Sequence, residues 1–399
     1  TEFSYLDKVP EKLKISFEDA EHEYGRLIEQ AINRQLMSDV EIGILLSGGI
    51  DSAIIAKCAR NNTGYRMKAF TVGFDGISAA DEVSDAKHTA DIIGLDHYTV
   101  NMGFEDFLQN LKKCIDIVEE PIATTSMVPM FFLSELASRY VKVVFTGQGA
   151  DEPLGGYGRY QGELLKEAIP KLFYPLLKYF LNRSGIKDDQ ILRFANAAEF
   201  NNDIERFQKI YEVFNPDEVK SLIGTYNPNT KSSIQYFYDL LGCSQYNEPV
   251  ERMMALDTRM NLSDDLLLYT DKITMHHSLE CRVPMLDLEL IKFIEALPRN
   301  YRIKLSNSKI IHKKFASHYL PREIVHRKKK GFLSPTADWF LKKNEIKDIL
   351  LNPDSVFANH FDLSTVNKII REHQAGFNRE RQIFLLLGIH FWMASITNG

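Results

Sequence analysis

Short apolar runs and stretches of helical periodicity alternate along residues 1–160 of the chain. A short run of consecutive apolar residues indicates a buried strand, whereas apolar residues spaced three or four positions apart indicate an amphipathic helix. The runs predict strands over 41–46, 67–74, 97–100 and 141–146. The periodic stretches predict helices over 16–37, 53–60, 83–94, 104–118 and 127–140.

Strands that alternate with helices at this spacing are typical of parallel βαβ units with right-handed crossovers. We therefore predict an α/β fold with a doubly wound parallel sheet, and we assign residues 1–160 to one α/β domain that binds a ligand at the carboxyl ends of its strands.

The strand pattern fades after Tyr160, and helical periodicity continues to the end of the chain. The predicted helices cover 161–182, 189–213, 232–242, 249–280, 286–297, 308–319, 338–350 and 364–396. Because no Ser/Gly-rich linker separates the two halves, we expect residues 161–399 to form a helical region packed on one edge of the sheet.

Composition and charge narrow the classes of function. The 399 residues are 44% hydrophobic and 26% charged, which is typical of a globular protein, and the formal net charge is -6. A negative net charge argues against nucleic acid as the partner.

The apolar stretch 383–396 carries His390 and is too short to cross a membrane. The chain opens without a basic-then-apolar leader, so we expect a cytoplasmic protein. Its four cysteines show no CxxC spacing, so neither disulfides nor structural zinc are expected.

A glycine-rich turn follows the first predicted strand and opens a predicted helix. It reads Ser47-Gly48-Gly49-Ile50-Asp51-Ser52. Free backbone N–H groups at a helix start favour an anion, the two glycines allow the backbone to approach it, and the Ser47 and Ser52 hydroxyls add donors. The turn is therefore predicted to cradle a pyrophosphate, although a glycine turn can also join a strand to a helix for geometric reasons alone. It is neither a Walker A loop nor GxGxxG.

Two acidic residues follow predicted strands in the same way. Asp51 lies in the glycine turn, and Asp151 follows the fourth predicted strand inside a second glycine-flanked block. One aspartate in such a place is commonly a helix N-cap. Two of them at the carboxyl edge of a sheet are hard oxygen ligands of the kind that Mg²⁺ takes beside phosphates. We predict that Asp51 and Asp151 bind magnesium on ATP.

Four motif blocks together carry a resemblance to a known family. Residues 47–52 resemble the signature of the PP-loop ATP pyrophosphatases. Residues 147–157 read Gly-x-Gly-x-Asp-Glu-x-x-Gly-Gly-Tyr, residues 271–287 read Asp-Lys-x-x-Met followed by Leu-Glu-x-Arg-x-Pro-x-Leu-Asp, and residues 327–339 read Arg-x-Lys-x-Gly-Phe followed by Pro and Trp. In this order the blocks resemble the synthetase part of the asparagine synthetase family, from about Tyr5 to the end of the chain.

The resemblance implies a reaction and its cofactors. Such enzymes use ATP and Mg²⁺ to convert a carboxylate, here most directly aspartate, into an acyl-AMP with release of pyrophosphate. Ammonia or another amine then displaces AMP to form an amide. The nucleotide contacts that the resemblance implies, beside the turn 47–52, are Leu46, Val72, Thr146 and Gly147.

The third and fourth blocks add residues near the reacting groups. The family's catalytic lysine falls on Lys329, where it would neutralise charge on the α-phosphate, while Lys328 and Lys330 are expected at the surface. A basic run by itself is usually a solvated loop. In the third block, Lys272, Glu280 and Arg282 are assigned to the carboxylate substrate, although Glu280 and Arg282 can equally form a structural ion pair in the helical core.

The sequence departs from the family at two positions of interest. Gln148 stands where asparagine synthetases carry an acidic residue and a related β-lactam-forming synthetase carries tyrosine, and Tyr269 stands where many relatives have lysine. The resemblance places the Gln148 side chain at the acyl acceptor end of the pocket, among the catalytic residues. An uncharged amide there leaves open a carboxylate other than aspartate.

The amine donor is a further open point. Full-length relatives begin with a glutaminase domain headed by a cysteine, whereas residues 1–40 precede the first predicted strand here and contain no cysteine. We therefore expect that a glutaminase has been removed from this chain, is a separate partner, or is replaced by another amine source. Association into a homodimer is left open.

Three alternatives to an asparagine-forming ligase remain. The first is an amidotransferase or ring-closing synthetase for a secondary metabolite, sugar acid or peptide, which Gln148 favours. The second is a tRNA-modifying PP-loop enzyme, which needs a basic face and often catalytic or zinc-binding cysteines. The third is a non-catalytic partner subunit, against which Asp51, Asp151 and Lys329 argue.

Overall fold

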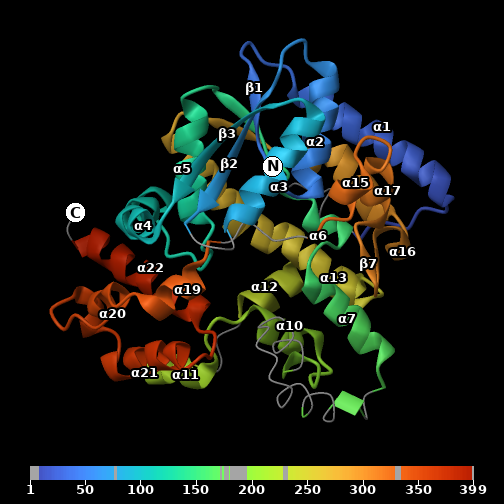
Figure 1. Ribbon diagram of the computed structural model, residues 1–399. Helices are drawn as coiled ribbons and strands as arrows, with labels where there is room; N and C mark the ends of the chain where they lie inside the picture. The colour runs from blue at the N-terminus through green and yellow to red at the C-terminus, as the bar shows by residue number, and fades with distance from the viewer. Residues whose placement is uncertain are drawn as a thin grey trace.

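A five-stranded, all-parallel sheet forms the centre of the protein in the computed structural model, which describes residues 9–75, 79–170, 173–174, 179, 196–227, 232–328 and 334–397. The strand order is β3-β2-β1-β4-β5 (Figure 1). The strands are β1 (Ile42–Leu45), β2 (Lys68–Phe74), β3 (Asp96–Met102), β4 (Val143–Phe145) and β5 (Glu280–Arg282). The predicted doubly wound parallel sheet is confirmed.

Strand β5 is a correction to the sequence analysis, which predicted a helix over 249–280 and no strand after Tyr160. The helix ends at His276, Ser278 takes a positive φ of 55°, and the chain then pairs in parallel with β4, with Glu280 opposite Val143. The strand was missed because its three residues are Glu, Cys and Arg, which form no apolar run.

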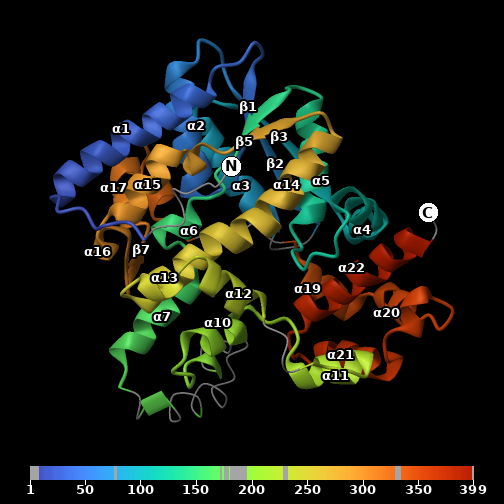
Figure 2. The same cartoon turned by 180° about the vertical axis from the view of Figure 1, so that it is seen from behind.

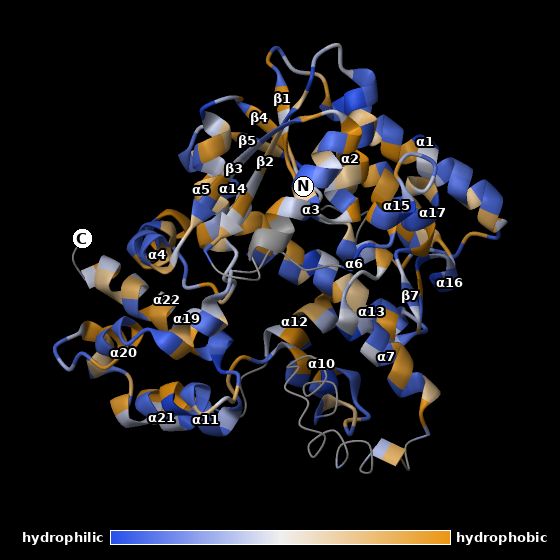
Figure 3. Cartoon of the chain, in the orientation of Figure 1, coloured by the Kyte–Doolittle hydropathy of each residue, from blue (hydrophilic) through white to orange (hydrophobic). Residues whose placement is uncertain are grey.

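One helix precedes the first strand, and four helices connect the first four strands. They are α1 (Phe17–Gln35), α2 (Ile50–Asn62), α3 (Ala79–Ile93), α4 (Phe104–Val118) and α5 (Met127–Ser138). Side chains of β1 alternate between two cores: Ile42 and Ile44 belong to the core beneath α1 and α2, and Leu45 belongs to the core beneath α4 and α5. Burial on both faces explains why β1, β2 and β4 are apolar runs rather than alternating patterns, and hydrophobic colours mark β1 in Figure 3.

The second half of the chain is mostly helical. Its helices are α6 (Asp151–Leu154), α7 (Gly158–Ala168), α10 (Asp203–Tyr211), α11 (Pro216–Ile223), α12 (Ser233–Leu240), α13 (Pro249–Leu256), α14 (Leu268–His276), α15 (Leu288–Ala296), α16 (Arg299–Arg302), α17 (Ile310–Ala316), α18 (Arg322–Val325), α19 (Thr336–Lys342), α20 (Glu345–Leu350), α21 (Leu363–Gln374) and α22 (Glu380–Thr397). A π-helical segment, Asp257–Leu267, joins α13 to α14. A short hairpin of β6 (Ile303–Lys304) and β7 (Asn307–Ser308) precedes α17.

Several predicted helices are shorter than expected. The stretch 338–350 is divided into α19 and α20, and 364–396 is divided into α21 and α22, with the Asn378 side chain accepting from the Glu380 N–H at the start of α22. The predictions over 161–182 and 189–213 fall partly outside the described residues. Within the described ranges, no helix combines the length and the apolar character needed to cross a membrane.

The later helices cover both faces of the sheet rather than one edge. Helices α15 and α17 pack on α1, whereas α14 packs on α4 and α5 and α22 packs on α4 (Figure 1). Helices α7, α10, α12 and α13 form a further core below the sheet, and the rod from α13 to α14 runs from that core up to the sheet (Figure 2). The division at residue 160 stays a prediction, because residues from both sides of it share two of the hydrophobic cores.

Candidate active site

The site lies at the carboxyl ends of β1 and β4. These strands are neighbours, but the chain continues from β1 to β2 on one side and from β4 towards β5 on the other. Such a reversal of strand order opens a crevice in which parallel α/β sheets bind their ligands. Residues 46–52 follow β1 and residues 146–157 follow β4, so both glycine-rich blocks reach this crevice.

The turn after β1 is folded around two hydroxyl groups. Ser47 Oγ lies 3.1 Å from Ser52 Oγ, the Ser47 N–H donates to Ser52 Oγ at 3.2 Å, and the Gly49 N–H donates to Ser47 Oγ at 3.3 Å. Helix α2 begins at Ile50, directly after Gly49, which has no side chain to cap it. The first N–H groups of this helix therefore have no side-chain cap, and anion binding by Ser47, Gly48, Gly49, Asp51 and Ser52 stays a prediction.

The glycine turn 47–52 and the block 147–157, here called the acidic block, touch at Gly147. A Cβ atom there would lie 2.7 Å from the backbone nitrogen of Ser52 and 3.0 Å from Asp51 Cβ. Only glycine allows the acidic block to lie this close to the start of α2. The acidic block and the glycine turn therefore form one continuous surface.

The residues assigned to the nucleotide lie around this surface. Leu46 follows β1, Thr146 and Gly147 follow β4, and Val72 lies on β2. Leu46, Val72 and Thr146 are buried, and the Leu46 carbonyl accepts from Thr71 Oγ1 at 2.7 Å. The four residues therefore come from three adjacent strands, and their contact with a nucleotide stays a prediction.

A buried lysine joins the two predicted metal ligands. Lys309 Nζ lies 2.7 and 2.6 Å from the two carboxylate oxygens of Asp51 and 2.8 Å from Asp151 Oδ1. The Lys309 side chain is 5% exposed, and those of Asp51 and Asp151 are 15% and 14% exposed. Burial alone would lower the pKa of Lys309, but the two carboxylates raise that pKa above its usual value. The lysine is therefore a charged ammonium.

The backbone fixes where Lys309 lies. It has φ 54° and ψ 40°, a left-handed conformation that is uncommon for a residue other than glycine, and its N–H donates to the Leu154 carbonyl at 3.2 Å. Its side chain passes over the bare backbone of Gly156, where a Cβ atom would collide with Lys309 Cε and with Asp151 Oδ1. The glycine pair of the acidic block therefore leaves room for the ion pair.

A buried histidine lies close to Asp51. His312 Nε2 lies 3.3 Å from Asp51 Oδ1, and His312 Nδ1 is hydrogen-bonded to Tyr24 OH at 2.6 Å. His312 and Tyr24 are both fully buried. Because His312 follows Lys309 by three residues, one face of α17 presents both side chains to Asp51.

The rest of the acidic block is held by structural contacts. Tyr157 OH donates to Glu152 Oε1 at 2.6 Å, and burial, with a contribution from Asp151, raises the pKa of Glu152 to about 7. Asp151 and Glu152, although adjacent, thus lie in different environments. Asp151 faces the cation, whereas Glu152 is buried behind it against a phenol.

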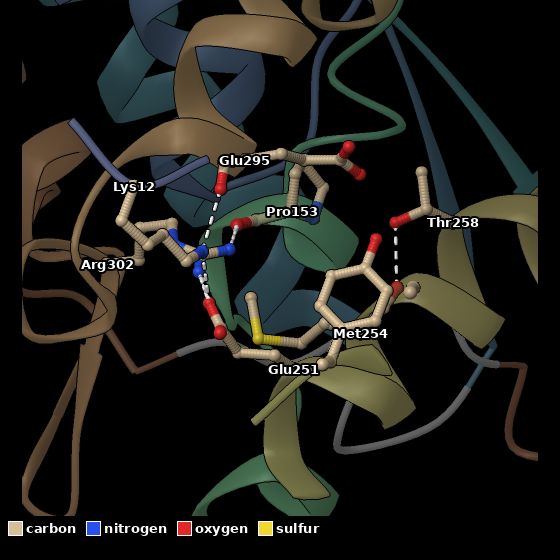
Figure 4. A pocket seen from close by; sticks show the side chains of 9 residues that line it. Lys12, Pro153, Glu251, Met254, Thr258, Glu295 and Arg302 are labelled. Carbon is tan, nitrogen blue, oxygen red and sulfur yellow. Dashed lines mark hydrogen bonds and ion pairs between the residues drawn. The ribbon is translucent and has the colours of Figure 1, made fainter. Parts of the chain in front are cut away.

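An ion cluster anchors helix α6, which carries the acidic block (Figure 4). Arg302 Nη1 donates to the Pro153 carbonyl at 3.3 Å, and Arg302 also pairs with Glu251. Lys12 Nζ donates to Glu251 Oε1 at 2.6 Å and to the Glu295 carbonyl at 2.8 Å. The cavity between these side chains has a volume of about 10 Å³, room for about one water molecule. The cluster is therefore a structural clamp rather than a substrate pocket.

Gln148 points from the acidic block towards α14. Its Nε2 donates to Thr270 Oγ1 at 2.9 Å, and its buried Oε1 meets no hydrogen-bond donor among the described residues. Tyr269, the neighbouring departure from the family pattern, is buried in the core. Gln148, which is one of the two departures from the family pattern, thus connects the site to helix α14 in the helical part of the chain.

The residues assigned to the carboxylate substrate make contacts elsewhere. Arg282 Nε donates to Glu280 Oε1 at 2.7 Å, and Arg282 Nη1 donates to the carbonyls of Gln35 and Met37. These contacts favour the structural ion pair, which lies on β5 rather than in the helical core as predicted. Lys272 Nζ bonds the Val118 carbonyl and Glu119 at the end of α4.

The first residue of the basic run 327–330 is bonded to the glycine turn. Arg327 Nη1 donates to the Gly48 carbonyl at 2.7 Å and to Thr89 Oγ1 at 3.0 Å. Lys328 is exposed, as expected. Lys329 and Lys330 lie outside the described residues, so the role assigned to Lys329 stays a prediction.

Lys309, His312 and Tyr24 were missed by the sequence analysis. The available signal was weak: His312 falls on the apolar face of the predicted helix 308–319, where a polar residue needs a partner. Nothing local identifies Asp51 as that partner, because the contact spans most of the chain.

The two aspartates fit a magnesium ion that is shared with a nucleotide. Within the described ranges, no group of three or more His, Cys, Asp or Glu side chains could hold a metal. Asp51 and Asp151 nevertheless converge on one cation, the Lys309 ammonium. Magnesium is commonly held by one or two carboxylates, with phosphate oxygens and water as the other ligands.

Comparison with known proteins shows that one family pattern matches nearly the whole chain, including the site. The pattern of the family described as asparagine synthase matches residues 23–394, which include all four motif blocks. A putative glutamine-hydrolyzing asparagine synthetase of Mycobacterium tuberculosis is 29% identical, over 93% of this chain and 57% of the relative. Glutamine-hydrolyzing asparagine synthetase 1 of Bacillus subtilis is 28% identical, over 95% of this chain and 61% of the relative. The amidase chyE of Penicillium rubens is 27% identical, over 85% and 56%. The chain thus spans somewhat more than half the length of these relatives.

The packing at Gly156 generates a prediction. A methyl group in Gly156→Ala would push apart Asp151 and Lys309, so we expect the free energy of unfolding to fall by about 1–3 kcal/mol, the usual cost of overpacking. Gly64→Ala is the matched control, because a Cβ there meets nothing within 4 Å and should change stability by less than about 0.5 kcal/mol. Urea unfolding of the two variants measures both values. Equal stabilities would contradict the described packing.

Proposed function

The chain belongs to the asparagine synthase family, and on that basis we propose that it is an ATP-dependent amide-forming ligase that adenylates aspartate and transfers the acyl group to ammonia. The observation that carries the proposal is the convergence of Asp51 and Asp151 on one cation beside the free N-terminus of α2. This arrangement suits a triphosphate with its metal, and the switch point of the sheet is where such a ligand binds.

Different residues would bind the phosphates, the rest of the nucleotide and the metal ion. The N–H groups at the start of α2 and the hydroxyls of Ser47 and Ser52 would bind the phosphates. Leu46, Val72, Thr146 and Gly147 would line the nucleotide, as the family resemblance implies. Asp51 and Asp151 would hold Mg²⁺, which when bound withdraws negative charge from the phosphate oxygens.

The reaction then needs two displacements. A carboxylate oxygen of the substrate attacks the α-phosphorus, the bond to the bridging oxygen breaks, and pyrophosphate leaves. Ammonia attacks the acyl carbon of the acyl-AMP, AMP leaves with the bonding electrons, and a proton is released. The chain contributes by holding the reacting groups in line and by stabilising charge as it develops.

Lys329 is the proposed source of part of that stabilisation. Its chain position supports the assignment, because Arg327, two residues earlier, bonds the carbonyl of Gly48 in the cradle and so begins the basic run at the phosphate site. An ammonium near the α-phosphate would neutralise the charge that builds up there.

The substrate is proposed from Gln148 and from the names of relatives. Relatives named asparagine synthetases favour aspartate as the acceptor and ammonia as the amine. A second candidate is an amide-forming ligase of the same type that acts on another carboxylate. The uncharged Gln148, bonded to Thr270, and the relative named an amidase favour this second candidate.

The first experiment measures the products of ATP cleavage. The protein is incubated with ATP, Mg²⁺, ammonium and a panel of carboxylates that includes aspartate, and AMP, ADP, pyrophosphate and phosphate are quantified. We expect AMP and pyrophosphate in equal amounts, dependent on the carboxylate. Asp51→Asn, which withdraws one anionic metal ligand, should lose most of this activity. Formation of ADP and phosphate would contradict the proposal. Supplying ammonium directly makes the result independent of glutamine hydrolysis.

The second experiment tests aspartate as the acceptor. If aspartate is the substrate, Gln148→Glu restores the acidic side chain of the family and should preserve or raise asparagine formation. If another carboxylate is the substrate, the same change buries a charge against Thr270 and should impair its amidation. Asparagine formation by wild type and variant is measured by chromatography with aspartate and ammonium. Loss of asparagine formation in the variant would favour the second candidate.

A further inference from the structure

We propose that Lys309 is the resident counter-ion of Asp51 and Asp151 and that it makes metal binding at this pair depend on the nucleotide. The inference rests on the proposed function, since it concerns how ATP and its metal enter that site. It makes Lys309 a positioning residue: it acts through the two aspartates.

The first argument is the place of the ammonium. Lys309 Nζ contacts both oxygens of Asp51 and Oδ1 of Asp151, all within 2.8 Å. It therefore occupies the point where the two carboxylates converge. A divalent ion bound by the same oxygens must share them with a charge of the same sign.

The second argument is that the ammonium is held there by the fold. The left-handed backbone of Lys309, the bond from its N–H to Leu154, and the contact of its side-chain stem with Gly156 all fix the direction of the side chain. Lys309 is not an exposed side chain that solvent can draw away, since it is only 5% exposed.

The third argument is the buried ring that lies beside the same carboxylate. His312 Nε2 lies 3.3 Å from Asp51 Oδ1, and the other ring nitrogen is hydrogen-bonded to Tyr24. Asp51 therefore lies among the Lys309 ammonium, this ring and the start of α2. The crowding leaves the carboxylate little room to turn away from Lys309 towards a metal ion that arrives alone.

The charge balance then sets the order of binding. Two carboxylates and one ammonium carry a net charge of one negative unit. That net charge attracts a free divalent ion only weakly, because water screens the repulsion between the ion and the nearby ammonium only in part. A triphosphate adds negative charge and brings its own metal. The metal thus enters as its nucleotide complex, and Lys309 keeps the aspartates together until then.

The test measures Mn²⁺ binding, with water-proton relaxation as the readout, because protein-bound Mn²⁺ relaxes water differently from free or nucleotide-bound Mn²⁺. Wild-type protein should bind Mn²⁺ with α,β-methylene-ATP and at least about 10-fold more weakly without it. Lys309→Met keeps an unbranched stem as far as Cε and removes the ammonium, so it should bind Mn²⁺ without nucleotide about 10- to 100-fold more tightly than wild type.

Lys314→Met is the matched control. Lys314 belongs to the same helix, is exposed and lies 3.9 Å from Glu21, so its replacement removes the same charge from α17 away from the aspartates. This variant should behave as wild type. If Lys314→Met tightens Mn²⁺ binding as much as Lys309→Met does, the effect is one of overall charge and the inference is overturned.

The outcomes also separate the inference from the proposed function. If wild type binds Mn²⁺ equally well with and without the nucleotide analogue, the inference is wrong and the proposed function stands. If wild type binds no Mn²⁺ even with the analogue, the proposed function fails. If Lys309→Met is unstable without metal, its melting temperature is measured with and without Mn²⁺. A rise with Mn²⁺ that wild type does not show supports the inference. Should the variant not fold at all, the wild-type comparison alone decides.

Discussion

The contact of the Lys309 ammonium with Asp51 and Asp151 joins three distant parts of the chain. Asp51 follows β1, Asp151 follows β4, and Lys309 lies between the β6–β7 hairpin and α17. Two carboxylates this deep in the protein carry a large desolvation cost unless a cation accompanies them. The α/β half supplies the carboxylates and the helical half supplies the cation. Neither half can therefore form the site alone, which accounts for the shared cores and for α17 packing on α1.

Features encoded locally could be predicted from the sequence. Strands β1, β2 and β4 are apolar runs because both faces of the sheet are covered there, and the cradle is visible because its two glycines follow such a run. Asp51 and Asp151 were found by their place after strands. Strand β5 could not be found, because its pairing with β4 and not its composition makes it a strand. Lys309 could not be found either, because its partners are set by the tertiary fold and its own neighbourhood resembles an ordinary helix start.

The contacts divide the predicted site residues into two groups. The turn 47–52, Gly147, Asp151 and Gln148 meet at the switch point, whereas Glu280, Arg282 and Lys272 hold β5 and α14 against α1 and α4. Motif blocks therefore mix residues that meet at the switch point with residues whose contacts lie between secondary-structure elements. The roles assigned to both groups towards a ligand stay predictions. Gln148 belongs to the first group and connects it through Thr270 to α14, so the helical half also borders the place where the acceptor would bind.

In the proposed reaction, this crevice directs a carboxylate onto the α-phosphate of ATP. The most direct measurement follows the oxygen atoms of the acceptor. Aspartate labelled with ¹⁸O in its side-chain carboxylate is incubated with the protein, ATP, Mg²⁺ and ammonium, and the products are analysed by mass spectrometry. We expect one ¹⁸O atom in each AMP formed and the other in the amide. Label in pyrophosphate or inorganic phosphate, or AMP formed without label, would contradict the proposed reaction.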